Sequence, residues 1–156
     1  MSRETKLILL ASLIALSLPI LYLAVLSLLS KRPANLGVRN GRLAECPSSP
    51  NCVSSQATDA AHRMDPIAFS GSPEDAFAKL RAIVEALPRA AIVSSDAHYL
   101  HAEFSTALFR FVDDAEFLID PQARVIHFRS ASRAGHSDLG VNRKRIDDIR
   151  QKFAER

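Results

Sequence analysis

An uninterrupted run of apolar residues near the amino terminus constrains this chain most. It starts at Leu7 and ends at Leu29, and its 23 residues carry no charge. At about 1.5 Å per residue, a helix of this length covers roughly 35 Å, while the hydrocarbon core of a bilayer is about 30 Å thick. The run therefore predicts a single transmembrane helix, within a membrane anchor at residues 1–30, whose partner is the lipid bilayer.

Two other structures are compatible with an apolar run near the amino terminus. A cleaved signal peptide has a shorter apolar region, of about 7 to 15 residues, and a cleavage site of small residues. No convincing A-x-A sequence follows the run in this chain. A buried core helix is the second alternative. We favour the anchor because the run is long enough to cross a bilayer.

The rest of the chain is long enough for one domain with its own hydrophobic core. The chain has 156 residues and a net charge of +3, and its basic and acidic residues are interleaved. It contains no Trp and no block of five Lys or Arg residues. These features argue against nucleic acid as a partner.

Residues 31–63 are predicted to form a connector with a cysteine loop, because Pro, Gly, Ser and Asn are frequent there. The segment holds the only two cysteines, Cys46 and Cys52, in the sequence CPSSPNC. We favour a structural disulfide, and leave open two free thiols or a metal or redox site. The spacing does not fit C-x-x-C redox chemistry, and zinc would need two further ligands where only His62 is near.

Residues 64–156 carry the pattern of an α+β domain. Ser72 and Pro73 predict the start of a helix whose apolar face recurs until Pro88, and Asn142 is predicted to cap a last helix. Strands are predicted over residues 66–69, 90–93, 98–104, 108–119 and 124–130. The order β-α-β-β-β-β-α predicts an antiparallel sheet with the two helices packed on one face.

Alternation along these strands separates an apolar face from a polar one. The apolar face should carry His98, Leu100, Ala102, Phe104, Phe109, Phe111, Ala115, Phe117, Ile119, Ile126 and Phe128. On the polar face, His101, Glu103 and His127 could hold a metal if their strands are neighbours. Histidines on a polar sheet face are usually solvated or hydrogen-bonded, so we expect no metal.

The loop between the last strand and the last helix is the densest polar segment. Residues 129–145 read RSASRAGHSDLGVNRKR. Its backbone N–H groups and arginines could hold a phosphate or carboxylate. Alternatively, the arginines pair with nearby acids and fix the loop, which is the interpretation we favour. The ligand-binding candidates are Arg129, Ser130, Ser132, Arg133, Asp138, Asn142, Arg145, Asp113 and Asp114.

No motif of established chemistry occurs in the chain. It contains no G-x-S-x-G, P-loop, dinucleotide fingerprint or H-E-x-x-H. We therefore assign no catalytic residue and expect no cofactor.

Four stretches, residues 36–38, 43–55, 111–117 and 129–145, resemble the uncharacterised family catalogued as domain of unknown function 1499. The resemblance covers residues 36–153. The family has no established catalytic role, so the resemblance lends no metal, cofactor or catalytic residue. It implies a membrane segment or export signal, as in bacterial members, or association with the thylakoid, as in plastid members.

Indications for the orientation of the anchor are opposed. Arg3 and Lys6 precede the apolar run, whereas Lys31, Arg32, Arg39 and Arg42 follow it, which favours a cytoplasmic domain. The cysteine pair and the family resemblance favour a domain outside the cytoplasm. We expect a single-pass protein of the cell inner membrane with a periplasmic domain.

Three functions are compatible with these features. The one we favour is a non-catalytic binding or assembly module at the membrane surface, which recognises a membrane protein or an anionic small molecule through residues 129–142, Asp113 and Asp114. The second is an enzyme acting on an anionic or lipid-derived substrate in a pocket, with His101 or His127 as acid or base and Arg129 or Arg133 holding the anion. The third is a purely structural subunit of a membrane complex, marked by an exposed apolar patch.

Overall fold

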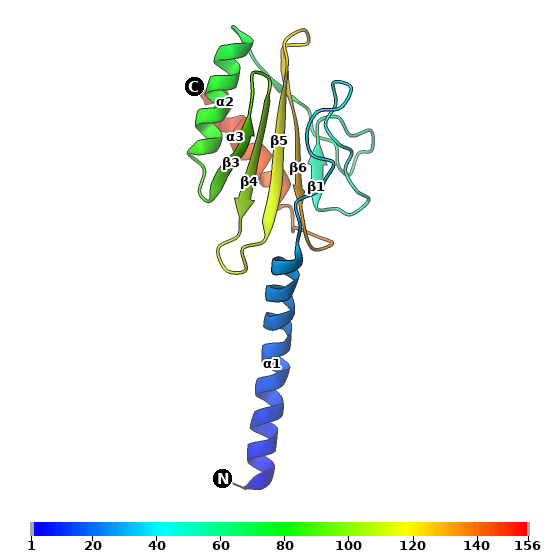
Figure 1. Cartoon of the computed structure of the whole chain (residues 1–156), viewed down its shortest axis with the longest axis vertical. Coiled ribbons are helices and arrows are strands. Elements are labelled where there is room, and N and C mark those ends of the chain that lie inside the picture. Colours follow the sequence, from blue (N-terminus) through cyan, green and yellow to red (C-terminus); the bar gives the residue numbers. More distant parts are fainter. Residues whose placement is uncertain (1, 156) are drawn as a thin grey trace.

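A long amino-terminal helix carries the folded domain at its carboxyl end (Figure 1). The structure is a computed structural model and describes residues 2–155. Helix α1 spans Arg3–Leu29, continues through Pro19 and has no buried residue. Most of its leucines and isoleucines are exposed, and only Leu23 and Leu26 near its carboxyl end are half-buried, so α1 is not a core helix of the domain.

The domain is α+β, as predicted. Its elements are β1 (Cys52–Ser54), β2 (Ile67–Ala68), α2 (Pro73–Glu85), β3 (Ala90–Ser95), β4 (Tyr99–Ser105), β5 (Val112–Asp120), β6 (Val125–Ser132) and α3 (Val141–Glu155). The strands form one antiparallel sheet in the order β1-β6-β5-β4-β3, and β2 also pairs with β6.

The core lies between the apolar face of the sheet and the two domain helices. Phe117 of β5 lies opposite Phe128 of β6, and both are fully buried. Helix α2 contributes Leu80, Ile83 and Val84, and helix α3 contributes Ile146, Ile149 and Phe153. Alternation with a period of two along the strands and apolar positions three and four apart along the helices produce this layer.

The start of α2 confirms its sequence prediction, whereas α3 begins differently. The Ser72 hydroxyl accepts the Asp75 N–H at 3.0 Å, and Pro73 is the first helical residue. Asn142 was predicted to cap α3, but it lies inside the first turn and is fully buried. The Asp138 carboxylate instead accepts the N–H groups of Gly140 and Asn142. An acceptor three residues before the first helical residue thus satisfies donors at the start of α3.

The connection between β4 and β5, residues 106–111, corrects the prediction of a strand beginning at residue 108. The Thr106 and Phe111 backbones are hydrogen-bonded at 2.9 Å, and the Thr106 hydroxyl accepts the Phe111 N–H. Arg110 adopts a positive φ of 56°, which a strand cannot contain. Phe109 and Phe111 therefore lie in a loop, with ring centroids 6.1 Å apart, and not on the core face.

The connector is more than a linker, because it adds an edge strand and covers the polar face of the sheet. β1 lies within it and pairs with residues 129–131 of β6. Ahead of β1, Arg32 binds Glu103 of β4, and the Gly37 N–H donates to Glu116 of β5 at 2.7 Å. Gly37 has a φ of 101°, which strongly favours glycine, since a side chain there would be strained.

Cys46 and Cys52 form a disulfide, as favoured from the sequence. The bond closes a short loop whose last residue begins β1, so it holds the connector against the edge of the sheet. Replacing both cysteines with serine should lower the free energy of unfolding by about 2 kcal/mol, because the unfolded chain without the cross-link gains conformational entropy.

Thiol titration and thermal unfolding of the full chain check this expectation. We expect no reactive thiol before reduction and two after it, with a lower melting temperature in the reduced protein. Two reactive thiols in the unreduced protein would contradict the disulfide.

Candidate functional site

The polar face of the sheet holds a cluster of charged side chains beneath the connector, here called the covered cluster. Its members are Tyr99, His101 and Glu103 of β4, Asp114 and Glu116 of β5, Arg129 of β6, and Arg133, which follows β6. Asp114 and Glu116 are at most 1% exposed, and His101 and Arg129 are 4% exposed. Strand alternation places these side chains on one face.

Arg133 is the main cation of this cluster. Its Nε and Nη2 donate to the two carboxylate oxygens of Asp114, at 2.8 and 2.7 Å, and Nη2 also binds Glu103. Burial pushes the pKa of Asp114 upward, but hydrogen bonds from Arg133 and His101 outweigh it and hold this pKa below its ordinary value. The same carboxylates raise the pKa of Arg133, with Asp114 as the largest cause. The pair is therefore fully ionised at neutral pH.

Glu116 is the most deeply buried acid of the covered cluster. It accepts hydrogen bonds from the Tyr99 hydroxyl and the Gly37 N–H, both at 2.7 Å, and pairs with Arg129 at 3.4 Å. Burial, together with Glu116, raises the pKa of Tyr99, so this phenol stays protonated and donates. Among residues 2–155, no partner meets the buried Arg129 Nε. Arg129 is thus less completely satisfied than Arg133.

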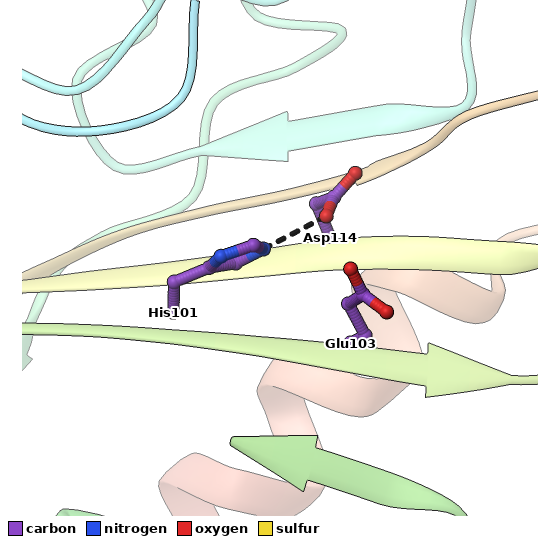
Figure 2. A group of neighbouring side chains, drawn as sticks. All are labelled: His101, Glu103 and Asp114. Atoms are coloured by element: carbon purple, nitrogen blue, oxygen red, sulfur yellow. Dashed lines mark hydrogen bonds and ion pairs between the residues drawn. The ribbon is translucent and has the colours of Figure 1, made fainter. Parts of the chain in front are cut away.

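His101, Glu103 and Asp114 are the residues of the described chain that come nearest to a metal-binding geometry (Figure 2). Their ligand atoms lie within 4.8 Å of one another, and His101 Nε2 is 2.8 Å from Asp114 Oδ1. Arg133 already contacts both carboxylates and supplies the positive charge at this point. A metal ion would have to displace its guanidinium.

His127 does not join this group, because β5 separates its strand from that of His101. Its Nδ1 lies 3.1 Å from the Ser55 hydroxyl. Burial lowers the pKa of His127. The charge of Asp120 opposes this shift and the charge of Arg42 adds to it, and the net shift is downward, so the ring is neutral at pH 7. The pairing of His101, Glu103 and His127 considered from the sequence is therefore not formed, and Asp114 lies where His127 was expected.

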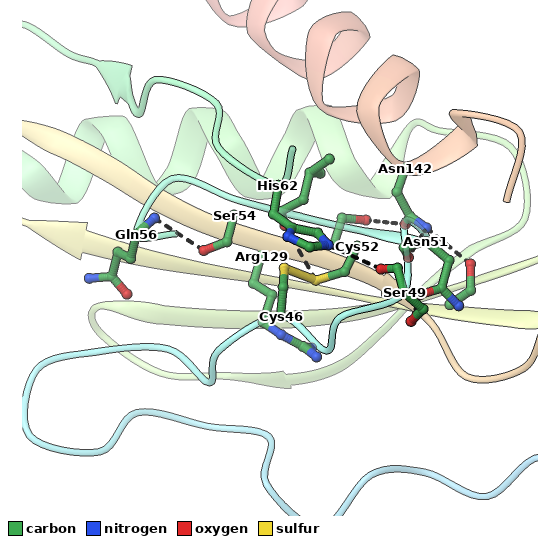
Figure 3. Close-up of a disulfide and its surroundings, with 12 residues drawn as sticks. Cys46, Ser49, Asn51, Cys52, Ser54, Gln56, His62, Arg129 and Asn142 are labelled. Carbon is green, nitrogen blue, oxygen red and sulfur yellow. Dashed lines mark hydrogen bonds between the residues drawn. A yellow bond between two sulfur atoms is a disulfide. The ribbon is translucent and has the colours of Figure 1, made fainter. Parts of the chain in front are cut away.

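A second polar group, the Asn142 cluster, lies on the opposite face of the sheet, under the start of α3. The Asn142 amide oxygen accepts from Ser130 and Arg145, both at 2.6 Å. Its amide nitrogen has three acceptors within 3.1 Å: the Ser132 hydroxyl, the Asp138 carboxylate and the Asn51 carbonyl. Asn142 thus joins α3, β6 and the cysteine loop (Figure 3).

Beside the Asn142 cluster is an open pocket of about 420 Å³ between the α2–β3 turn, the ends of β4 and β5, and α3. Its apolar lining includes Leu87, Pro88, Phe104 and Val141. The Arg145 guanidinium lies 4.5 Å from the centre of the Phe104 ring and pairs with Asp113 at 2.5 Å.

Two further cations, Arg89 and Lys144, line the pocket and form no ion pair with any of residues 2–155. Asp113 is paired with Arg145, and Asp148 with Lys152. The uncompensated charge of the pocket is therefore positive.

A smaller pocket of about 220 Å³ lies between α1 and the domain. Leu23 and Leu26 of α1 line it together with Phe111 and Gly135. The two pockets share Thr106, Asp113 and Val141, so the larger one is next to the end of α1.

Comparison with known proteins identifies the family of the domain. The model of the family described as "Protein of unknown function (DUF1499)" matches residues 42–153, from the cysteine loop to the last turns of α3. The chain belongs to this family. No curated protein matches the chain. The DUF1499 region holds the whole Asn142 cluster and every member of the covered cluster, whereas Arg32 and Gly37 of the connector precede it.

The candidate residues of this DUF1499 protein are divided between the two faces of the sheet. Arg129, Arg133 and Asp114 belong to the covered cluster. The remaining candidates, Asp113, Ser130, Ser132, Asp138, Asn142 and Arg145, belong to the Asn142 cluster.

Three of the four arginines of residues 129–145 pair with acids, as favoured from the sequence, whereas Arg143 donates to the Ala61 carbonyl. Arg129 pairs with Glu116, Arg133 with Asp114, and Arg145 with Asp113. Of the candidates, only Asp113 and Arg145 line the larger pocket. Ligand binding by any of the candidates stays a prediction.

Sequence reasoning missed the connector residues and the pocket cations. Arg32 and Gly37 contact the sheet from 71 and 79 residues away, and nothing local in the sequence marks such contacts. Three acids, Glu103, Asp114 and Glu116, on the polar face of the predicted sheet could have indicated a covering segment. Acids this close together need either solvent or a covering segment that supplies positive charges and hydrogen-bond donors. Arg89 and Lys144 lie in polar surface segments that resemble any solvated turn or helix face.

Proposed function

We propose that this DUF1499 protein is a membrane-tethered, non-catalytic binding module whose 420 Å³ pocket takes an amphiphilic anion. The observation that carries the proposal is the pocket itself, with apolar walls and unpaired Arg89 and Lys144. Ligand pockets for small molecules are mostly apolar, occupy roughly 300–1,000 Å³ and hold a few polar groups that orient the ligand. An acyl chain with a carboxylate or phosphate head matches that combination.

The tether rests on α1. A helix of 27 residues with no buried side chain leaves most of its apolar surface exposed to water, which costs free energy. A bilayer removes that cost, because roughly 20 apolar residues span its hydrocarbon core. The position of Leu23 and Leu26 also favours retention over cleavage as a signal peptide, because both line a pocket together with residues of the folded domain, which a removed leader would not do.

The periplasmic location is part of this proposal. Structural disulfides persist in oxidising compartments and are rare in the cytosol. The Cys46–Cys52 bond therefore favours a domain on the periplasmic side of the inner membrane. The basic residues that follow α1 oppose this orientation, and the disulfide is the stronger argument because it requires the compartment chemically.

The burial of the covered cluster argues against the enzyme alternative. An acid or base must reach its substrate within hydrogen-bond distance. His101 is 4% exposed and bonded to Asp114, and Arg133 is held by two carboxylates. His101 and Arg133 are therefore occupied within the cluster, and His127, the other histidine of that alternative, lies apart from them beside Ser55.

A photo-crosslinking experiment tests the proposal. The full chain is reconstituted in phosphatidylcholine vesicles with oleic acid that carries a diazirine group, and crosslinked peptides are mapped by mass spectrometry. We expect labelling of residues 87–89 or 141–145, which line the pocket, in addition to α1, which contacts bulk lipid. Lys144→Glu should reduce the pocket labelling several-fold, because it replaces an unpaired cation with an acid.

Arg124→Glu is the matched control. It makes the same kind of charge change at an exposed residue of the β5–β6 turn, at the end of the domain away from α1 (Figure 1). It should leave pocket labelling unchanged. Labelling of α1 alone, or equal pocket labelling in both variants, would overturn the binding proposal. No labelling of α1 would overturn the tether.

A further inference from the structure

We infer that two loops of the domain enter the surface of the same bilayer that holds α1, so that the domain rests on the membrane in one fixed orientation. The loops are the β4–β5 loop (residues 106–111) and the β6–α3 loop (residues 133–140). Both lie at the end of the domain from which α1 emerges (Figure 1). This inference rests on the proposed tether and is independent of what the pocket binds.

The loops carry the two most exposed large apolar side chains of the domain. Leu108 is 81% exposed and Leu139 is 94% exposed. Within residues 31–155, no other large apolar side chain is more than half exposed. Isolated exposed leucines are ordinary on protein surfaces. Here, however, the two extremes of the domain lie at one end, beside the one segment long enough to cross a bilayer.

The position of the loops along α1 places them at membrane depth. The smaller pocket is lined by Leu23 and Leu26 of α1 and by residues of both loops, among them Phe111 and Gly135. The apolar run ends at Leu29, so at about 1.5 Å per residue Leu26 and Leu23 lie roughly 5–9 Å before that end of the run. The run covers roughly 35 Å against about 30 Å of hydrocarbon, so loops at this height reach the boundary between hydrocarbon and headgroups.

Both loops hold their leucines outward by polar contacts of their own. The Thr106 and Phe111 backbones close the β4–β5 loop, and Asp138 fixes the turn around Leu139 through Gly140 and Asn142. Leu139 has a positive φ of 55°, an unfavourable conformation for leucine, combined with an almost fully exposed side chain. Neither feature helps the domain in water, whereas both help a leucine that projects into lipid.

The charges at this end are also those of an interfacial surface. Lys31 lies two residues after the end of α1, and Arg110 lies in the β4–β5 loop. Both are exposed, and neither forms an ion pair in the described chain. Apolar residues that enter the acyl boundary, flanked by Lys or Arg that reach lipid phosphates, are typical of proteins that lie on a membrane surface.

The absence of Trp from the chain makes a direct test possible. Single Trp reporters are introduced by Leu108→Trp, Leu139→Trp, Leu16→Trp in the middle of α1, and Gln122→Trp in the β5–β6 turn. Each full-length variant is reconstituted in phosphatidylcholine and phosphatidylglycerol vesicles with or without brominated acyl chains. We expect blue-shifted emission and several-fold stronger quenching by brominated lipid at positions 108 and 139 than at position 122, approaching that at position 16.

The four reporters separate this inference from the tether. Strong quenching at position 16 with none above the position-122 level at 108 and 139 would overturn bilayer entry and leave the tether standing. Blue-shifted emission at 108 and 139 without quenching would also overturn it, because the loops would then be covered by protein. No quenching at position 16 would overturn the tether, and with it the inference.

Discussion

Arg133→Ala should lower the free energy of unfolding by about 3–5 kcal/mol, because it leaves a buried ion pair with only its acidic members. Asp114 would lose both guanidinium hydrogen bonds while 1% exposed, and Glu103 would keep only Arg32. Small domains are stable by about 5–15 kcal/mol in total, so this loss brings the domain close to unfolding. Denaturation of the full chain in detergent micelles, followed by circular dichroism, measures it.

Two variants make the Arg133 result interpretable. Arg81→Ala removes an arginine whose ion pair with Glu85 is half exposed on both sides, and it should change stability by less than about 0.5 kcal/mol. Arg133→Lys keeps the charge but loses the paired hydrogen bonds, so its loss of free energy of unfolding should lie between those of Arg133→Ala and Arg81→Ala. If Arg133→Ala cost no more than Arg81→Ala, the covered cluster would not contribute to folding as described.

Asn142→Ala should lower the free energy of unfolding by about 2–3 kcal/mol, because buried groups lose their only or best partners. Asn142 is fully buried, accepts from Ser130 and Arg145, and donates toward Asn51, Ser132 and Asp138. The Asn51 carbonyl would keep its other donor, the Ser132 N–H, at 3.0 Å. Chemical denaturation gives the stability, and hydrogen exchange at the Ser132 amide reports loosening of the cysteine loop.

Gln151→Ala is the control for Asn142 on the same helix. Gln151 is exposed and bonds only Glu155, one turn further along α3. Its replacement should leave stability within about 0.5 kcal/mol, since alanine is a strong helix former. Equal effects of the two substitutions would mean that the Asn142 hydrogen bonds add nothing to the stability of the domain.

Local and periodic features of this chain could be predicted from its sequence. The length of the apolar run predicts α1, the Ser72–Pro73 pair predicts the start of α2, and alternation assigns Leu100, Phe117 and Phe128 to the core. Each of these depends on residues within one turn or one strand. Pairing of the loop arginines with nearby acids was also favoured from the sequence, although the sequence did not show which arginine meets which acid.

The features that could not be predicted depend on contacts between distant segments. Apolar alternation at Phe109 and Phe111 matches a strand, but the positive φ of Arg110 turns the chain, which hydropathy does not encode. Asn142 has the residue type of a helix cap, but Asp138 lies nearer the free N–H groups. The cover over Glu116 comes from Gly37, in a polar segment that has no periodicity to show where it packs.

The route of the connector determines how a mechanical load on the anchor would reach the sheet. A pull on α1 arrives first at Arg32 and Gly37, whose attachments are a few polar contacts to β4 and β5. If these give way, the chain can be drawn out only as far as Cys46, because the disulfide joins that residue to the first residue of β1. Beyond that point the force shears β1 along β6. The disulfide therefore sets the length of connector that can be extended.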